Sequence, residues 1–258
     1  SILFADIRSY TTLTEQLTPE EVVMLLNRYF ETMVDVIFDH RGTLDKFIGD
    51  AIMAVFGSPI PQADHAQRAV ATALDMQTHL TEFNQQQQRQ GLSTIQIGIG
   101  INSDDVITGN IGSSKRMEFT AIGDGVNLTS RIEGATKLYG CAILISEKTY
   151  HLCQDTIWVR ELDYVCVKGK RQAVRLYEVL GLRSQPLSPE QQQQLELYAK
   201  GRELYQQRQF SLAIDTFSQL LRQSPKDQAT RLQIKRCQHL QQHPPAPNWD
   251  GSWQLQEK

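Results

Sequence analysis

The order in which strand-like and helix-like segments follow one another constrains the fold of this chain more than any other feature. Over the first hundred residues the apolar side chains repeat as in a buried strand, an amphipathic helix, two strands joined by a turn, a second helix and a further strand. These segments are residues 1–7, 18–40, 44–56, 64–83 and 95–101. Strand, helix, two strands, helix, strand is the order of a ferredoxin-like βαββαβ sandwich. The sequence therefore predicts an α+β fold of this type.

Further strands and helices are expected after this core. Residues 106–111 are predicted to be the hairpin partner of strand 95–101. The remaining predicted elements are a strand at 119–122, a helix at 126–138, a strand at 142–146, a short helix, and strands near 158–167 and 175–180. We therefore expect the sandwich to carry extra C-terminal strands.

The composition changes at about residue 183, which suggests a domain boundary. We predict one domain over residues 1–182, a glutamine-rich linker at 183–194, a helical segment at 195–242 and an extended tail at 243–258. Four residues are spaced like the small, aromatic and terminating positions of a tetratricopeptide repeat: Gly201, Ala213, Phe217 and Pro225. One repeat cannot bury its own apolar face. The segment is thus either a helical appendage docked on the main domain, which we favour, or the first unit of an interaction array.

Charge and composition exclude several classes of function. The chain has 26 basic and 29 acidic residues and a net charge of −3, so no basic excess favours nucleic acid. No two of the four cysteines form a CxxC pair, which indicates neither a zinc site nor a disulfide framework. We find no signal peptide and no apolar run that could span a membrane, and expect a soluble, cytoplasmic domain. The abrupt start on an apolar strand predicts a piece of a longer protein, with an upstream sensor domain that could be membrane-attached.

Two aspartates stand at the ends of apolar runs. Asp6 follows four apolar residues, and Asp50 follows Phe47, Ile48 and Gly49. A carboxylate at the end of a buried strand is costly to desolvate unless it is paired or bound to a metal. Two of them on adjacent strands would make an oxygen site for Mg²⁺ or Mn²⁺. Each of them could instead cap a turn.

A third cluster lies further along the chain. Asn127 and Arg131 are four residues apart in the helix predicted after Gly123-Asp124-Gly125, and so share one helix face. An amide and a guanidinium side by side suit phosphate oxygens. An exposed pair making only local contacts is the ordinary alternative for these two residues alone.

Four blocks of sequence together are far more specific than any of these residues taken singly. They are FADIRSYT at 4–11, LDKFIGDAIMAVFG at 44–57, GNIGS at 109–113 and FTAIGDGVNLTSRIE at 119–133. They resemble the signature blocks of the class III adenylyl and guanylyl cyclases, in particular the bacterial adenylyl cyclases. The resemblance runs from the first residue to about Gly181.

This resemblance implies an adenylyl cyclase that converts ATP to cyclic AMP and pyrophosphate. In such an enzyme Asp6 and Asp50, helped by the backbone carbonyl of Ile7, hold two divalent metal ions, Mg²⁺ or Mn²⁺. Asn127 would orient the ribose and Arg131 would stabilise charge on the α-phosphate.

The same resemblance implies residues that bind the rest of the substrate. Lys168 matches a lysine that contacts the terminal phosphates, and Arg116 is a weaker candidate for that task. Lys46 and the Thr120 hydroxyl would recognise the base, because a donor and an acceptor together suit adenine. Guanylyl cyclases typically carry glutamate and cysteine at these places, so Lys46 disfavours GTP. The threonine form also occurs in bicarbonate-responsive members, which makes such a response conceivable here.

The resemblance also implies a homodimer with shared active sites. In this family the metal-binding aspartates of one subunit face the base-binding and phosphate-binding residues of the other. This chain holds both sets, so a two-fold dimer would build two equal sites. The alternatives are a guanylyl cyclase and a catalytically silent nucleotide-binding module; the second is disfavoured because both aspartates and the Asn127–Arg131 pair are present.

Overall fold

Strand β1 (Ile2–Ile7) is an inner strand of a sheet whose order agrees with the predicted sandwich. Its neighbours are β4 (Ile97–Asn102) and β3 (Ala51–Val55), both antiparallel to it, and β3 pairs in turn with β2 (Thr43–Ile48). The order β4-β1-β3-β2 is the one that a βαββαβ chain produces, so the predicted fold class is confirmed. A fifth strand, β7 (Ile143–Ser146), pairs with β4 in parallel.

The computed structural model describes residues 1–166 and 173–255. The chain divides into two compact units, the first comprising Ser1–Lys137 and Ala142–Gln154 and the second Leu138–Cys141 and Asp155–Lys258. Both units combine helices and strands. Among the helices in the described ranges, none has the length and apolar character needed to cross a membrane.

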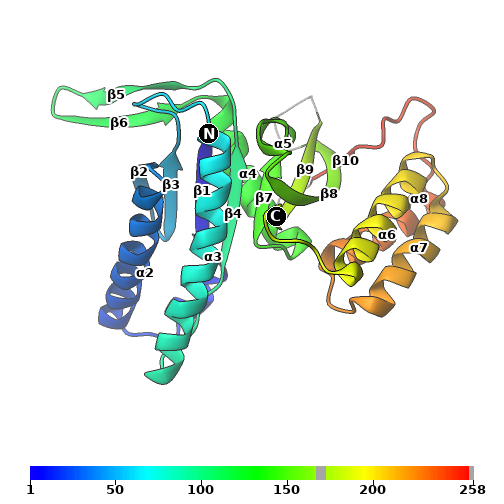
Figure 1. Ribbon diagram of the computed structural model, residues 1–258, viewed down its shortest axis with the longest axis horizontal. Coiled ribbons are helices and arrows are strands. Elements are labelled where there is room, and N and C mark those ends of the chain that lie inside the picture. Colours follow the sequence, from blue (N-terminus) through cyan, green and yellow to red (C-terminus); the bar gives the residue numbers. More distant parts are fainter. Residues whose placement is uncertain (167–172, 256–258) are drawn as a thin grey trace. The chain divides into compact units, whose positions relative to one another are not determined.

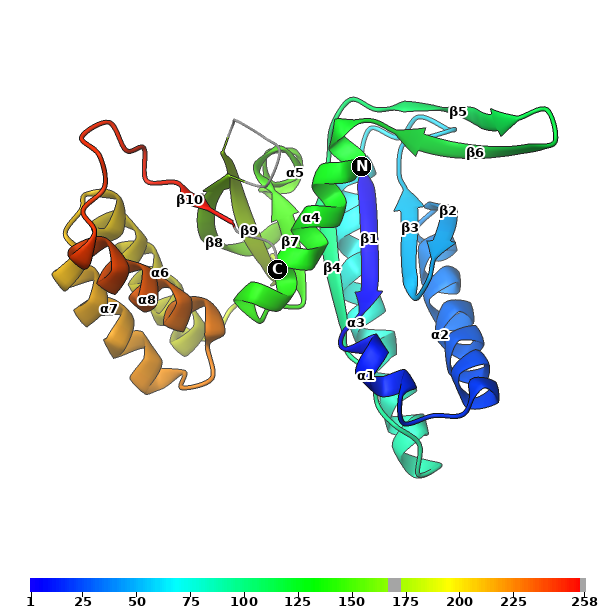
Figure 2. The same cartoon turned by 180° about the vertical axis from the view of Figure 1, so that it is seen from behind.

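The helices of the first unit cover both faces of its sheet. α2 (Pro19–Asp39) and α3 (His65–Arg89) lie on the face seen in Figure 1, and α4 (Asp124–Tyr139) lies on the opposite face (Figure 2). Two short helices, α1 (Tyr10–Thr14) and α5 (Glu147–Cys153), complete the unit. α2 begins with a capping box, in which Thr18 accepts from the Glu21 amide at 3.3 Å and Glu21 accepts from the Thr18 amide at 2.7 Å.

Two elements differ from the sequence prediction. α3 does not end near residue 83 but continues to Arg89, because glutamine is a good helix former and Gln87 lies in the core. The predicted pairing of residues 106–111 with strand 95–101 is wrong. β5 (Ile107–Ser113) pairs instead with β6 (Arg116–Ile122) in a separate two-stranded sheet, while β4 has β1 and β7 as neighbours. Alternation of apolar residues identifies a strand but not its partner.

Helix α4 crosses β4 at two glycines. A β-carbon added at Gly98 would lie 2.2 Å from the Thr136 hydroxyl, and one added at Gly100 would lie 2.3 Å from the backbone nitrogen of Glu133. The Glu133 backbone cannot move aside as the end of a flexible side chain could. The two glycines therefore determine how near α4 comes to the sheet.

Replacing Gly100 with alanine is expected to lower the free energy of unfolding by about 1–3 kcal/mol, because α4 would have to move away from β4. Gly134→Ala is the matched control: a β-carbon there meets no atom within 4 Å, and the residue lies on the exposed side of α4. That variant should gain up to about 1 kcal/mol from helix propensity. Urea unfolding followed by far-ultraviolet circular dichroism measures both, and equal effects would contradict the close packing.

The second unit joins a β-ribbon to three helices. β8 (Ile157–Cys166) and β9 (Val174–Leu182) are antiparallel, and β10 (Trp253–Gln254) pairs in parallel with β8. The helices are α6 (Pro189–Gln206), α7 (Phe210–Gln223) and α8 (Gln228–Gln242). A β-carbon at Gly201 would lie 2.5 Å from the Phe217 ring, so α6 and α7 pack closely at that glycine.

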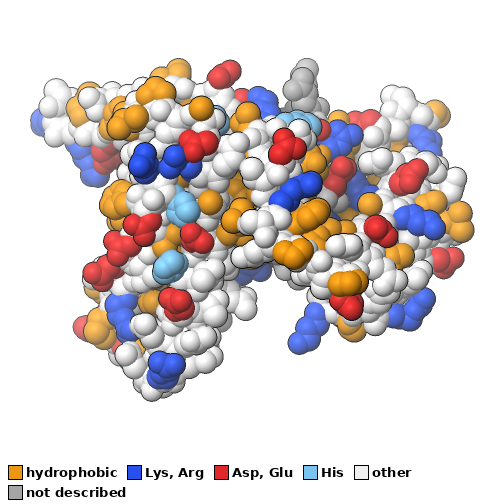
Figure 3. All heavy atoms as spheres, in the orientation of Figure 1, with side chains coloured by type: hydrophobic (Ala, Val, Ile, Leu, Met, Phe, Trp, Pro, Cys, Tyr) orange, Lys and Arg blue, Asp and Glu red, His pale blue; other side chains and the backbone are white. Residues whose placement is uncertain are grey.

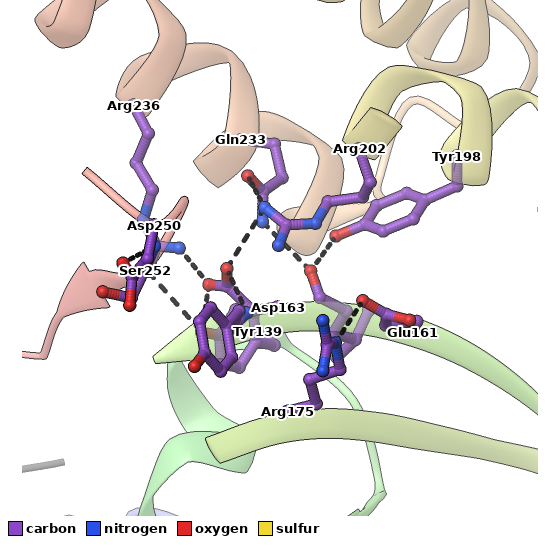
Figure 4. A network of polar contacts seen from close by, with 12 residues as sticks. Tyr139, Glu161, Asp163, Arg175, Tyr198, Arg202, Gln233, Arg236, Asp250 and Ser252 are labelled. Atoms are coloured by element: carbon purple, nitrogen blue, oxygen red, sulfur yellow. Dashed lines mark hydrogen bonds and ion pairs between the residues drawn. The ribbon is translucent and has the colours of Figure 1, made fainter. Parts of the chain in front are cut away.

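A buried ionic network connects β8 to α6 and α8 within this unit (Figure 4). Asp163 of β8 is fully buried and forms ion pairs with Arg236 and with Arg202, the latter at 3.2 Å. The Tyr139 hydroxyl donates to the same carboxylate at 2.6 Å. Although burial acts in the opposite direction, Arg236 and Arg202 hold the pKa of Asp163 below its usual range. The C-terminal helices are thus attached to β8 through a desolvated charge cluster.

Candidate active site

The two aspartates singled out in the sequence come together in the first unit. Asp6 lies at the end of β1, and Asp50 lies in the turn between β2 and β3. Burial and, after it, the adjacent Asp50 carboxylate together raise the pKa of Asp6 to about 6. One Asp50 oxygen, Oδ2, is buried and has no hydrogen-bond partner among the described residues. The pair is therefore electrostatically unfavourable as it stands.

A third acidic residue, Glu133 of α4, lies in the same region and was missed by the sequence analysis. Burial raises the pKa of Glu133 to about 8, the charge of Asp6 contributes in the same direction, and Arg8 opposes it. In the sequence, Glu133 is the last residue of the block at 119–133, and nothing in that block indicates that its side chain lies near Asp6. Its nearness to Asp6 follows from the crossing of α4 over β4, because Asp6 pairs with Gly98 and Gly98 lies against Glu133.

These residues fit a divalent cation. Adjacent carboxylates with an unsatisfied buried oxygen are the donor set that Mg²⁺ or Mn²⁺ would neutralise. Within the described ranges no group of three or more His, Cys, Asp or Glu residues is placed so that it could hold a metal ion by itself. That also fits, since Mg²⁺ is commonly held by one or two carboxylates together with water and substrate phosphates.

A second group of predicted residues comes together on β2 and β6. The Thr120 hydroxyl donates to both oxygens of Asp45, at 2.8 and 2.9 Å, and Lys46 Nζ lies 3.5 Å from Asp45 Oδ1. Lys46 Nζ also lies 3.2 Å from Glu118 Oε2. Lys46 and Thr120 are thus joined through a residue that the sequence analysis did not select.

The residues predicted to bind the ribose and the phosphates do not come together as the two groups above do. Arg116 is exposed on β6 and donates to Glu118 Oε1 from Nε at 2.9 Å. Asn127 is exposed and Arg131 partly exposed on α4, and neither side chain has a hydrogen-bond or ion-pair partner among the described residues. Lys168 lies outside the described residues. No hydrogen bond or ion pair between described residues joins Asp6 and Asp50 to the Lys46–Thr120 group.

Comparison with known proteins decides the family. Residues 1–181 match the family described as the adenylate and guanylate cyclase catalytic domain. This chain belongs to the class III nucleotidyl cyclase family. The family's match includes Asp6, Asp50, Lys46, Thr120, Asn127 and Arg131.

Relatives and solved structures include cyclases for both purine nucleotides. The adenylate cyclase of Anabaena cylindrica is 42% identical over 186 residues, which are 69% of this chain and 36% of that protein. Among solved structures, the guanylyl cyclase Cya2 is 44% identical with a TM-score of 0.67, and the match covers 70% of this chain and 91% of that one. The adenylyl cyclase CyaB of P. aeruginosa is 38% identical with a TM-score of 0.66, covering 70% and 93% of the two chains.

The chain spans only 27–36% of the length of the first curated relatives that it matches. Overall identity also does not separate ATP from GTP as substrate, because an adenylyl and a guanylyl cyclase are similar to this chain to nearly the same degree. Discrimination between the nucleotides must be argued from the residues that face the base.

Proposed function

We propose that this cyclase domain converts ATP to 3′,5′-cyclic AMP and pyrophosphate in an intracellular signalling pathway. The choice of ATP depends on one observation above all, that Lys46 and Thr120 lie on neighbouring strands and contact the same carboxylate. Lys46 offers only donors, which suits the ring nitrogen N1 of adenine, and the Thr120 oxygen can accept from the 6-amino group. Guanine has a hydrogen on N1, which would face the Lys46 donor, and a carbonyl at position 6, which offers no hydrogen to a Thr120 oxygen that accepts.

In the proposed reaction the ribose 3′-oxygen attacks the α-phosphorus, the bond to the bridging oxygen breaks, and pyrophosphate leaves. Asp6, Asp50 and the Ile7 carbonyl would hold two divalent ions. Such ions lower the pKa of the 3′-hydroxyl and neutralise the triphosphate. Asn127 would orient the ribose, and Arg131 would stabilise the charge that develops on the α-phosphate. Lys168 and Arg116 would bind the terminal phosphates.

The site is proposed to be shared between the two subunits of a homodimer. Asn127 and Arg131 have side chains without partners in the described part of one chain, although an amide and a guanidinium are strong hydrogen-bonding groups. Apolar side chains of β2, β5 and β6 are also exposed, and those of the β5–β6 hairpin lie along its surface in Figure 3. They are Phe47, Ile48, Ile107, Ile111, Met117, Phe119 and Ile122. An apolar surface of this kind favours association with a second copy.

The domain is further proposed to be one part of a longer, cytoplasmic signalling protein with an upstream sensor. This proposal is supported by the length of the curated relatives, which are about three times as long as the region that matches this chain. The sensor would then receive the activating signal and pass it to this domain.

The direct test of function is a product assay with ATP and with GTP, each in the presence of Mg²⁺ or Mn²⁺. We expect cyclic AMP from ATP and at least about a hundredfold lower kcat/KM for GTP, because mismatched donors and acceptors are left unpaired in the base site. Cyclic GMP as the main product would make this a guanylyl cyclase. The absence of both products from a folded dimer would favour the silent nucleotide-binding module.

The shared site is tested by mixing two inactive variants. An Asp50→Ala chain can still supply Asn127 and Arg131, and an Arg131→Ala chain can still supply both aspartates. Each homodimer should be nearly inactive, but a mixed dimer has one site without either defect. With free exchange about half of the dimers are mixed, so activity should return to roughly a quarter of wild type.

Recovery of activity should increase with protein concentration, because it requires association. Two copies of the Asp50→Ala chain carrying different affinity tags are the control for exchange. If exchange is demonstrated and no activity returns, the metal-binding and Asn127–Arg131 groups act within one chain.

A further inference from the structure

Strand β2 contains a β-bulge at the position where the base-binding residues lie. Leu44 is paired with Ala54 and Lys46 with Met53, so Asp45 is an extra residue with no partner on β3. In a regular strand Asp45 and Lys46 would point to opposite faces of the sheet. A bulge changes this alternation and can redirect a side chain. Here both residues contact β6, Asp45 at Thr120 and Ala121 and Lys46 at Glu118.

The Asp45 carboxylate is buried, and both of its oxygens accept hydrogen bonds. Its side chain is only 3% exposed. One oxygen, Oδ2, accepts from the Ala121 amide at 3.0 Å and from the Thr120 hydroxyl at 2.9 Å, and Oδ1 accepts from the same hydroxyl at 2.8 Å. The Thr120 hydroxyl has a single proton, and among the described residues its one other acceptor is the Ala121 carbonyl oxygen at 3.5 Å. Asp45 is the much closer acceptor.

We propose that Asp45 is a specificity-determining residue, which accepts the hydrogen bond that the Thr120 hydroxyl donates, so that the Thr120 oxygen can only accept a hydrogen bond from the base. A free threonine hydroxyl both donates and accepts, and would suit an amino group or a carbonyl at position 6 of a purine equally well. With its proton directed to Asp45, Thr120 accepts from the amino group of adenine and repels a carbonyl. This inference rests on the proposed function, in which Thr120 faces the base.

The same carboxylate also acts on Lys46. Lys46 Nζ is 3.5 Å from Asp45 Oδ1 and 3.2 Å from Glu118 Oε2, so the ammonium lies between two acidic groups. The lysine head group carries N–H donors and no acceptor, and these two contacts hold it beside β6. Asp45 thus supports both halves of the recognition pattern, a donor at Lys46 and an acceptor at Thr120.

Asp45→Asn tests this with little change in shape. The Ala121 amide requires an acceptor, so the new side-chain oxygen should replace Oδ2 and the new amino group should replace Oδ1. That amino group can donate to Thr120, which leaves the hydroxyl proton free to turn toward the base. Three substrates report the result: ATP, inosine triphosphate with a carbonyl at position 6, and purine riboside triphosphate with only hydrogen there.

The ratio of kcat/KM for ATP to kcat/KM for inosine triphosphate should be about tenfold lower in Asp45→Asn than in wild type. A factor of this size corresponds to the usual contribution of one hydrogen bond. The kcat/KM for purine riboside triphosphate should change much less, since it has no group for Thr120 to contact. Titrations with the α,β-methylene analogues of ATP and of inosine triphosphate, which cannot react at the α-phosphate, should show the same fall in the ratio of the two affinities. Asp75→Asn, on the exposed surface of α3, is the control for removal of a carboxylate.

Three outcomes separate this inference from the function on which it depends. If Asp45→Asn lowers turnover of all three substrates equally, Asp45 only holds β6 in place and the inference is wrong. If Thr120→Val relaxes selectivity but Asp45→Asn does not, Thr120 recognises the base without help and again the inference fails. If Thr120→Val leaves selectivity unchanged, the proposed recognition of the base is itself wrong. Wild type alone gives a fourth test, because equal use of ATP and inosine triphosphate would contradict a fixed acceptor even if no variant folds.

Discussion

Replacing Asp50 with asparagine is expected to lower kcat by at least about 1,000-fold, and Asp6→Asn should do the same. Each change removes a carboxylate that the two proposed metal ions require, and the charge stabilisation that metals supply in such reactions is several kcal/mol. Asparagine preserves the volume of the side chain, so the strands need not move. Steady-state cyclic AMP formation in saturating Mg²⁺ measures the effect, with Asp75→Asn as the matched control.

Stability should change in the opposite direction to activity. Without metal, the two carboxylates repel each other and Asp50 Oδ2 is buried without a partner. The melting temperature of metal-free Asp6→Asn should therefore be higher than that of wild type. Addition of Mn²⁺ should raise the melting temperature of wild type and have little effect on either variant. A folded variant that keeps near wild-type activity, or a wild type that Mn²⁺ does not stabilise, would contradict the two-metal site.

Asp163→Asn should be the most destabilising single change in the second unit, with a loss of about 3–5 kcal/mol. The substitution leaves Arg202 and Arg236 buried without their counter-ion. All three tryptophans, Trp158, Trp249 and Trp253, belong to this unit, so urea unfolding followed by tryptophan fluorescence reports on it specifically. Asp215→Asn, on the exposed side of α7, is the control and should change stability by less than about 0.5 kcal/mol.

Two further measurements distinguish this charge network from a simple packing contact. Asp163 has a lowered pKa when folded, so its stabilisation is present above the unfolded pKa of about 3.9 and is lost as the pH falls through the folded value. The difference between wild type and Asp163→Asn should therefore shrink as the pH is lowered below about 4. Replacing Asp163 with leucine and both arginines with methionine should recover most of the loss, since no unpaired charge remains. A triple variant as unstable as Asp163→Asn would show that shape, rather than charge, is decisive.

The order of elements was predictable because it depends on local signals. The apolar alternation of β1, the capping box at Thr18 and the glycine turn before Asp50 are each contained within a few neighbouring residues. Strand, helix and turn periods can be recognised at that range. The ferredoxin-like order of the first six elements follows directly from them.

Pairing and register could not be predicted in the same way. β5 and β4 have similar alternation, yet β5 pairs with β6, because partner choice is made across the whole sheet. Glu133 approaches the aspartates only because two glycines let α4 come close to β4. The Asp163 network joins residues that are up to 97 positions apart in the chain, as between Tyr139 and Arg236.

By itself the sequence determined the cyclase family, because four signature blocks can be read from residue type and local spacing, and the resemblance pointed to Asp6 and Asp50 as metal-binding candidates and to Lys46 and Thr120 as candidates for binding the base. Only the tertiary structure decided that Asp45, which in a regular strand would face away, reaches Thr120 through a β-bulge. The physical reason is that a bulge depends on the register between two strands, and register is a property of the folded sheet rather than of either segment alone.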